Sequence, residues 1–131
     1  LLLNVGPDAK GNIPPQSQAI LKEIGAWMKR NSKSIYGCGK AGMEKPDCGR
    51  ITRSGIKLYY HVFENSIGPL PLMGLKGEDI DCIRMLATGA EVPVSHSWMS
   101  GNYPDLAFAD LGPDPVLPDP VDTVLEVTLK E

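Results

Sequence analysis

The sequence predicts a mainly β protein, in which an antiparallel β-sandwich follows one buried strand and one helix. Three observations predict this class. An apolar run closed by Gly-Pro opens the chain, an amphipathic segment comes next, and from Cys48 onward short apolar segments alternate with Gly, Pro and Asn. Short segments separated in this way by turn residues are typical of an antiparallel sandwich.

The opening run Leu-Leu-Leu-Asn-Val, closed by Gly6 and Pro7, predicts a short strand at residues 1–5. A brief apolar run bounded by a turn signal favours a strand that is buried on both faces, as in a parallel sheet. Such a strand requires parallel neighbours beside it and helices over its faces. We therefore expect the chain to be the tail of a larger protein.

Residues 15–31 are predicted to form one amphipathic helix. Pro14 and Pro15 suit a helix start, where the missing N–H costs nothing. The basic pair Lys29 and Arg30 suits the negative end of the helix dipole. The face that repeats with helical spacing consists of Ser17, Ile20, Leu21, Ile24, Trp27, Met28 and Asn31.

The predicted strands of the sandwich are residues 49–52, 56–64, 68–72, 80–86, 91–94, 106–109 and 123–129. In the predicted strand 123–129, apolar and polar residues alternate, so one face should be buried and the other exposed to solvent. In 56–64 the second face carries Tyr59, His61 and Phe63, so we expect that face to be partly covered. The proline-rich span 95–120 is expected to be a stiff, irregular connection.

Composition excludes several classes of function. The 13 Lys and Arg are outnumbered by 16 acids and are scattered, so the sequence offers no basic face for nucleic acid. No window approaches the roughly 20 apolar residues of a membrane-spanning helix. The cysteines Cys38, Cys48 and Cys82 could be free thiols of a reducing cytoplasm, or Cys38 and Cys48 could form a disulfide. Unpaired cysteines slightly favour a cytoplasmic location, and secretion of the parent protein is the alternative.

The first part of the chain closely resembles a known protein family. LLLNVGP, the loop DAKGNIPP, a helix carrying IGAWM and the closing SIYG occur in this order within residues 1–37. This order resembles the end of the catalytic barrel in family 29 glycoside hydrolases, the α-L-fucosidases. Beyond Cys38 the likeness is looser, although Gly49 and Arg50 before Lys57 fit the start of that family's C-terminal β-domain.

The resemblance implies three parts. Residues 1–37 would be the last strand and helix of a (β/α)8 barrel, 38–48 a linker, and 49–131 the C-terminal β-sandwich. The parent protein would be a retaining exo-α-L-fucosidase that removes terminal fucose from glycans without a cofactor. Its nucleophile and its acid/base would lie on barrel strands outside this sequence. We therefore expect the chain alone to be inactive, with no catalytic residue or metal ligand of its own, and to support the barrel structurally.

Three residues are candidates for substrate binding. The resemblance places Asn4 near the barrel mouth, where it could support the active site or simply tie strands together. Trp98 and Tyr103 lie in the segment 96–103, where aromatic rings could stack on a sugar while Asn and Ser bind its hydroxyls. The alternative is a long loop that Trp98 pins to its own sheet.

Two further expectations concern function and partners. A rival to the enzyme fragment is a stand-alone carbohydrate-binding β-sandwich module. The expected partners are the rest of the barrel and a fucosylated glycan, without nucleic acid or membrane. Self-association through the exposed opening strand and helix is a further expectation.

Overall fold

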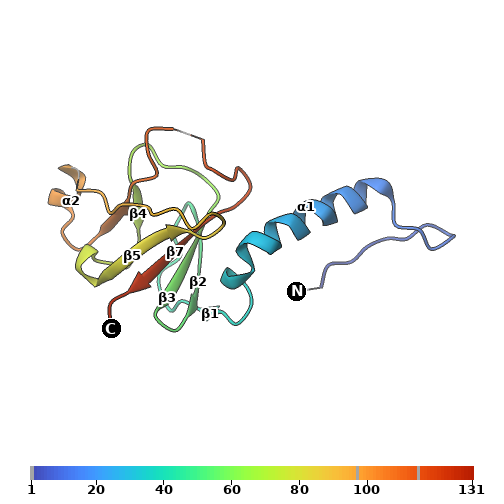
Figure 1. Ribbon diagram of the computed structural model, residues 1–131, viewed down its shortest axis with the longest axis horizontal. Coiled ribbons are helices and arrows are strands. Elements are labelled where there is room, and N and C mark those ends of the chain that lie inside the picture. Colours follow the sequence, from blue (N-terminus) through green and yellow to red (C-terminus); the bar gives the residue numbers. More distant parts are fainter. Residues whose placement is uncertain (1, 97, 115) are drawn as a thin grey trace. The chain divides into compact units, whose positions relative to one another are not determined.

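The computed structural model describes residues 2–96, 98–114 and 116–131, which form two compact units, Leu1–Ser32 and Lys33–Glu131. Figure 1 shows the long helix of the first unit and the sheets of the second. The described part is mainly antiparallel sheet with one long helix, as the sequence predicts at this coarser level. Among the described residues, no helix combines the length and the apolar content needed to cross a membrane.

The first unit contains one regular element, the helix α1 at Pro15–Asn31, with the bounds that its pattern predicts. A proline stands in its first turn, and Lys29 and Arg30 stand in its last turn. Both features match the expected helix start and dipole. Ile20, on the apolar face of α1, is 58% exposed.

The described residues 2–5 of this chain do not form the predicted opening strand, and Leu1 lies outside the described part. Leu2 and Leu3 are exposed. A strand exists only where its backbone N–H and C=O groups pair with a neighbour, and residues 2–5 have no neighbouring strand within the described part of the chain.

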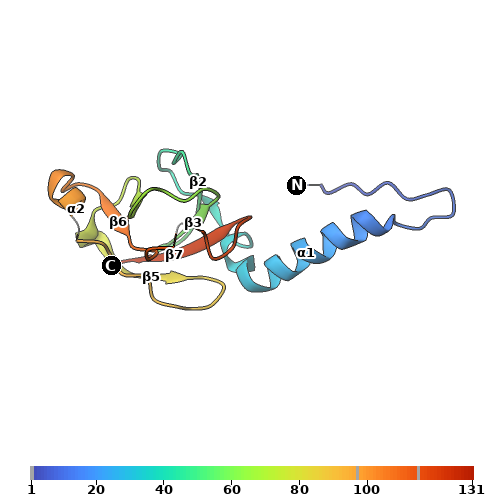
Figure 2. The ribbon, with the colours of Figure 1, turned by 90° about the horizontal axis from the view of Figure 1, so that it is seen from above.

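The second unit contains two antiparallel sheets. The larger one has the order β1-β2-β3-β7-β5 and the smaller one pairs β4 with β6. The strand bounds are β1 Gly39–Lys40, β2 Gly49–Ser54, β3 Lys57–Val62, β4 Leu70–Leu72, β5 Ile80–Met85, β6 Ala107–Ala109 and β7 Thr123–Leu129. Short helices complete the chain: the 3-10 turns Ser32–Ser34 and Gly77–Asp79, and the helix α2 at Trp98–Asn102. Figure 2 shows α2 next to β6.

Side chains of both sheets form one hydrophobic core. The pairs Leu58 with Val127 and Tyr60 with Leu125 stand opposite each other on β3 and β7. Leu125 is 0% exposed on β7, an inner strand of the larger sheet. The smaller sheet supplies Leu70, Leu72, Ala107 and Ala109 to the same core. The alternating pattern in the sequence therefore correctly identifies the core face of the larger sheet.

The opposite face of the larger sheet is more covered than the pattern of residues 123–129 predicts. Tyr59 and His61 are 4% and 6% exposed, which confirms the expected covering of the aromatic face of β3. Val124, on the face of β7 that is predicted to be exposed, is also buried. Ser34, just before β1, lies over this face, because its carbonyl accepts a 2.6 Å hydrogen bond from Thr52 Oγ1.

Other local differences concern short elements. Residues 91–94 form only isolated bridges, at Glu91 and Val94, instead of the predicted strand. β1 and α2 are not predicted by the sequence pattern, because two residues and five residues are too short to show a period. The disulfide between Cys38 and Cys48 is not formed, and Cys82 is free as well.

Candidate functional site

Several carboxylates stabilise turns. Asp110 Oδ1 accepts the N–H of Gly112 at 2.9 Å, and Asp114 Oδ1 accepts that of Val116 at 2.9 Å. Asp8 does the same before α1, where hydrogen bonds from Asn12 lower the pKa of its carboxyl. Side chains that bond their own backbone in this way are typical of turns. These acids therefore have a structural role.

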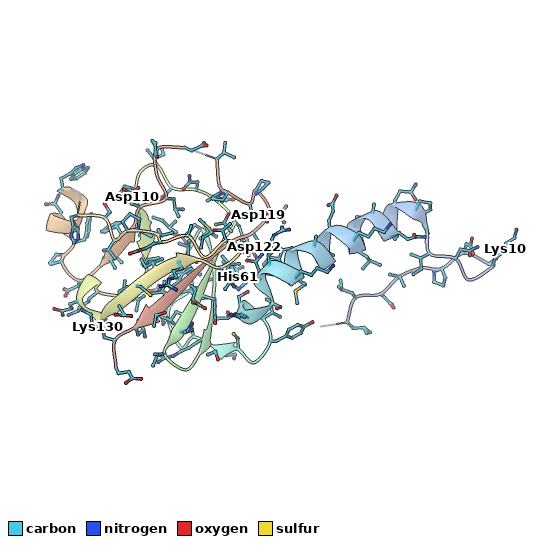
Figure 3. The ribbon with its side chains drawn as sticks, in the orientation of Figure 1. Lys10, His61, Asp110, Asp119, Asp122 and Lys130 are labelled. Carbon is cyan, nitrogen blue, oxygen red and sulfur yellow. The ribbon has the colours of Figure 1, made fainter. Side chains whose placement is uncertain are left out.

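Glu126 and Asp122 pair with basic side chains on β3. Lys57 Nζ lies 3.0 Å from Glu126 Oε1. His61 donates through Nδ1 to Asp122 Oδ2 at 2.9 Å, and this pair is largely buried. Figure 3 shows Asp122 beside His61, where β3 and the start of β7 lie next to each other. The pair joins two strands, and the sequence did not predict it because its members are 61 positions apart.

A cleft of about 440 Å³, lined by both polar and apolar residues, lies beside α2. Four segments line it: the turn at Lys76, Gly77 and Glu78, residues 94–96, Ser100 of α2, and residues 104–107. Its volume is within the range of small-ligand sites, roughly 300–1,000 Å³. His96 and Glu78 both contribute to this lining.

An ion pair stands on the wall of this cleft. Lys76 Nζ lies 3.0 Å from Asp105 Oδ1. The hydrogen bond and the charge of Asp105 raise the pKa of Lys76, so this ammonium stays charged at neutral pH. Sequence analysis does not predict this pair, because the two residues belong to separate turns. The apolar residues Val94, Leu106 and Ala107 belong to the same lining.

The predicted substrate-binding residues are all exposed. Trp98 is 78% exposed, which is incompatible with its pinning the loop to its own sheet. Tyr103 is 57% exposed just after α2. Neither ring belongs to the cleft lining, although Ser100 between them does. Asn4 is exposed in the irregular segment of the first unit. Ser97, within the predicted segment 96–103, lies outside the described residues.

Metal ligation finds no support in the described part of the chain. Across residues 2–96, 98–114 and 116–131, no three His, Cys, Asp or Glu side chains gather closely enough to hold a metal ion.

Comparison with known proteins gives the class of the fold first. An α-L-fucosidase isoenzyme 1 from Paenibacillus thiaminolyticus superposes with a TM-score of 0.93 at 49% identity, over 99% of this chain and 30% of that one. A family 29 α-L-fucosidase from Bacteroides thetaiotaomicron superposes with a TM-score of 0.78 at 25% identity, over 98% of this chain and 28% of that one. The fold is that of a β-rich part of a glycoside hydrolase.

Sequence comparison then gives the family. The sequence model described as alpha-L-fucosidase matches residues 1–33. An alpha-L-fucosidase of Dictyostelium discoideum is 58% identical over 36 residues, which cover 28% of this chain and 8% of that protein. The chain belongs to the α-L-fucosidases of glycoside hydrolase family 29. It spans 30% or less of the length of each of these relatives.

Proposed function

We propose that the chain is the C-terminal portion of an exo-acting α-L-fucosidase, which hydrolyses terminal α-linked fucose of glycans with retention of configuration. The observation that carries this proposal is the 49% identity to the Paenibacillus thiaminolyticus enzyme across 99% of the chain. The proposal concerns the parent protein, of which these residues are one part.

The proposed roles of the parts follow the family. Residues 1–37 are the last strand and helix of a (β/α)8 barrel, 38–48 are a linker, and 49–131 are a β-sandwich. Two observations support this division: the family match lies on residues 1–33, and the two sheets share one core. Exposed Leu2 and Leu3, together with Ile20 of α1, are the apolar groups that the rest of a barrel would bury.

Retention requires two carboxyl groups about 5 Å apart, one as nucleophile and one as acid/base. The carboxylates of Asp110 and Asp114 are bound to their own turns, and those of Asp122 and Glu126 pair with His61 and Lys57. We assign the reactive pair to the barrel of the parent protein, and the reaction needs no cofactor. The Bacteroides relative was trapped as a covalent intermediate, which supports retention.

The contribution of this segment to substrate binding would come from its exposed polar and aromatic groups. We assign Asn4 to the barrel mouth, and Trp98 and Tyr103 to the rim of the site. The exposure of both rings supports this assignment, because a stacking platform must be open to its ligand.

The test compares the 131-residue chain with its parent protein on an aryl α-L-fucoside. We expect the parent protein to release the phenol and the chain alone to release none. Nuclear magnetic resonance of the first sugar product should show the α anomer, because configuration is retained. Hydrolysis by the chain alone, or a parent protein without activity, would contradict the proposal.

The second candidate function is a stand-alone carbohydrate-binding module, which the exposure of Trp98 favours. It predicts a parent protein that cleaves no fucoside, and a chain that binds fucosylated oligosaccharides through Trp98. Trp98→Ala would then abolish binding, whereas Tyr36→Ala, which removes another exposed aromatic ring, would preserve it. Hydrolysis by the parent protein excludes the stand-alone module.

A further inference from the structure

We propose that the cleft beside α2 is a binding site for a neutral pyranose unit of the glycan, held by the ion pair of Lys76 and Asp105. The proposal rests on the proposed function for the identity of the ligand as a glycan. It goes beyond that function because it assigns binding to residues outside the predicted set of Asn4, Trp98 and Tyr103.

The walls of the cleft are fixed by the backbone. Ala107 N–H donates to the carbonyl of Leu75 at 2.7 Å, and Ser95 N–H donates to that of Phe108 at 2.7 Å. Leu75 and Ala107 belong to the hydrophobic core. A wall held in this way loses little freedom when a ligand binds, so less of the binding free energy is lost to ordering.

The ion pair on the wall has little value for folding. Both side chains are exposed, and exposed ion pairs contribute little to stability. It has more value for binding. An ammonium carries three donors and a carboxylate accepts several hydrogen bonds, so the 3.0 Å contact leaves further donors and acceptors on both groups. Neighbouring hydroxyls of a sugar can donate to Asp105 and accept from Lys76.

The remaining lining suits the same ligand. Ser100 and His96 add polar groups, while Val94, Leu106 and Ala107 add apolar surface. A pyranose ring has the same two characters, because its hydroxyls point outward around an apolar ring face. Lys76, Glu78 and Asp105 together leave one net negative charge on the lining, which favours a neutral sugar over an anionic one.

The test uses the 131-residue chain and lactose as the neutral pyranose probe, with amide nuclear magnetic resonance as the readout. We expect shifts at Lys76, Glu78, His96, Ser100 and Asp105, with a dissociation constant in the millimolar range. Sorbitol, which has the hydroxyls but no ring face, should give no saturable shift at these residues. A saturable shift with sorbitol would overturn the pyranose assignment.

Two variants test the ion pair. Asp105→Asn and Lys76→Gln should each weaken lactose binding about tenfold, since each removes a charged hydrogen-bond partner. Both side chains are exposed, so both variants should fold. Lys40→Gln and Asp114→Asn change the lining of two other clefts and should leave the dissociation constant unchanged.

Binding that both ion-pair variants leave unchanged would overturn the proposal, as would shifts confined to other clefts. The proposed function is tested separately by fucoside hydrolysis of the parent protein. If the parent protein is active but the chain binds no lactose, only the proposal of a sugar site in the cleft is overturned. If the parent protein is inactive but the chain binds lactose at the cleft, the proposed fucosidase function is overturned and the proposed sugar site stands.

Discussion

The two units of this chain differ in where their apolar side chains lie. In the second unit, Leu58, Leu125 and Val127 are completely buried in a core that two sheets share. In the first unit, α1 exposes Ile20 and Ile24, and Leu2 and Leu3 precede it without a strand. The family match, however, lies on residues 1–33. The part that most clearly carries the family's sequence is thus not the part that carries a core.

The largest expected effect is a loss of stability when a side chain of the shared core is truncated. Leu125→Ala should lower the free energy of unfolding of the second unit by about 3 kcal/mol, because it removes buried methyl groups and leaves a cavity. Urea unfolding followed by circular dichroism measures it. Val121→Ala, at an exposed position, should change it by less than about 0.5 kcal/mol. Equal effects would refute the assignment of the core.

The next largest effect is expected at the buried pair of His61 and Asp122. Asp122→Ala should lower the free energy of unfolding by about 2 kcal/mol, because His61 Nδ1 loses a carboxylate partner at 2.9 Å. The control is Asp81→Ala, which removes an exposed carboxylate of β5. If the two variants unfold at the same urea concentration, the pair adds nothing to stability.

A smaller effect should appear in alkali. Burial, with the charge of Glu126 as a second cause, raises the pKa of Tyr59 to about 12, and burial also raises the pKa of Tyr60. Unfolded tyrosine loses its proton near pH 10, so the unfolded state binds fewer protons than the folded state above that pH. Stability is therefore complete well below pH 10, and Tyr59 alone should lower it by roughly 1 kcal/mol per pH unit between pH 10 and 12, with Tyr60 adding to this fall.

Urea unfolding at pH 9, 10 and 11 measures this slope, and phenolate absorbance reports the ionisation directly. Tyr59→Phe is the matched variant, because it keeps the ring and removes the ionisable hydroxyl. Its stability should fall less steeply with pH than that of the original chain. A slope that is the same in both proteins would mean that Tyr59 ionises equally in the folded and unfolded states.

The smallest expected effect lies in the first unit. Replacing Ile20 and Ile24 together by Ser should change the free energy of unfolding of the second unit by less than about 0.5 kcal/mol, since both side chains are exposed. The same variant should reduce self-association of the chain, measured by sedimentation, because it removes an exposed apolar stripe. A destabilised second unit would show that the two units share stability.

Sequence reasoning succeeded where a periodic pattern was long enough to read. The bounds of α1 and the position of β7 follow from apolar spacing over 17 and 7 residues. It failed where neighbours decide the outcome. Val124 is buried on the face that the alternating pattern predicts to be exposed, and a strand at residues 2–5 depends on a partner to pair with.

The candidate site was predicted only in part, for the same reason. The sequence pointed to the region of Trp98 and Tyr103 through its residue types, and both rings are exposed there. The cleft itself is built from turns that lie far apart in the sequence, so Lys76 and Asp105 gave no local signal. Composition can indicate aromatic and polar groups near a site, whereas the pairing of distant turns requires the fold.

Amide hydrogen exchange of the isolated chain tests most directly whether the second unit carries its own core while the first depends on the rest of the enzyme. We predict slow exchange in β3, β5 and β7, whose hydrogen bonds open only when the core opens, and fast exchange throughout residues 2–31. Protection of α1 equal to that of β7 in the monomeric chain would contradict the account.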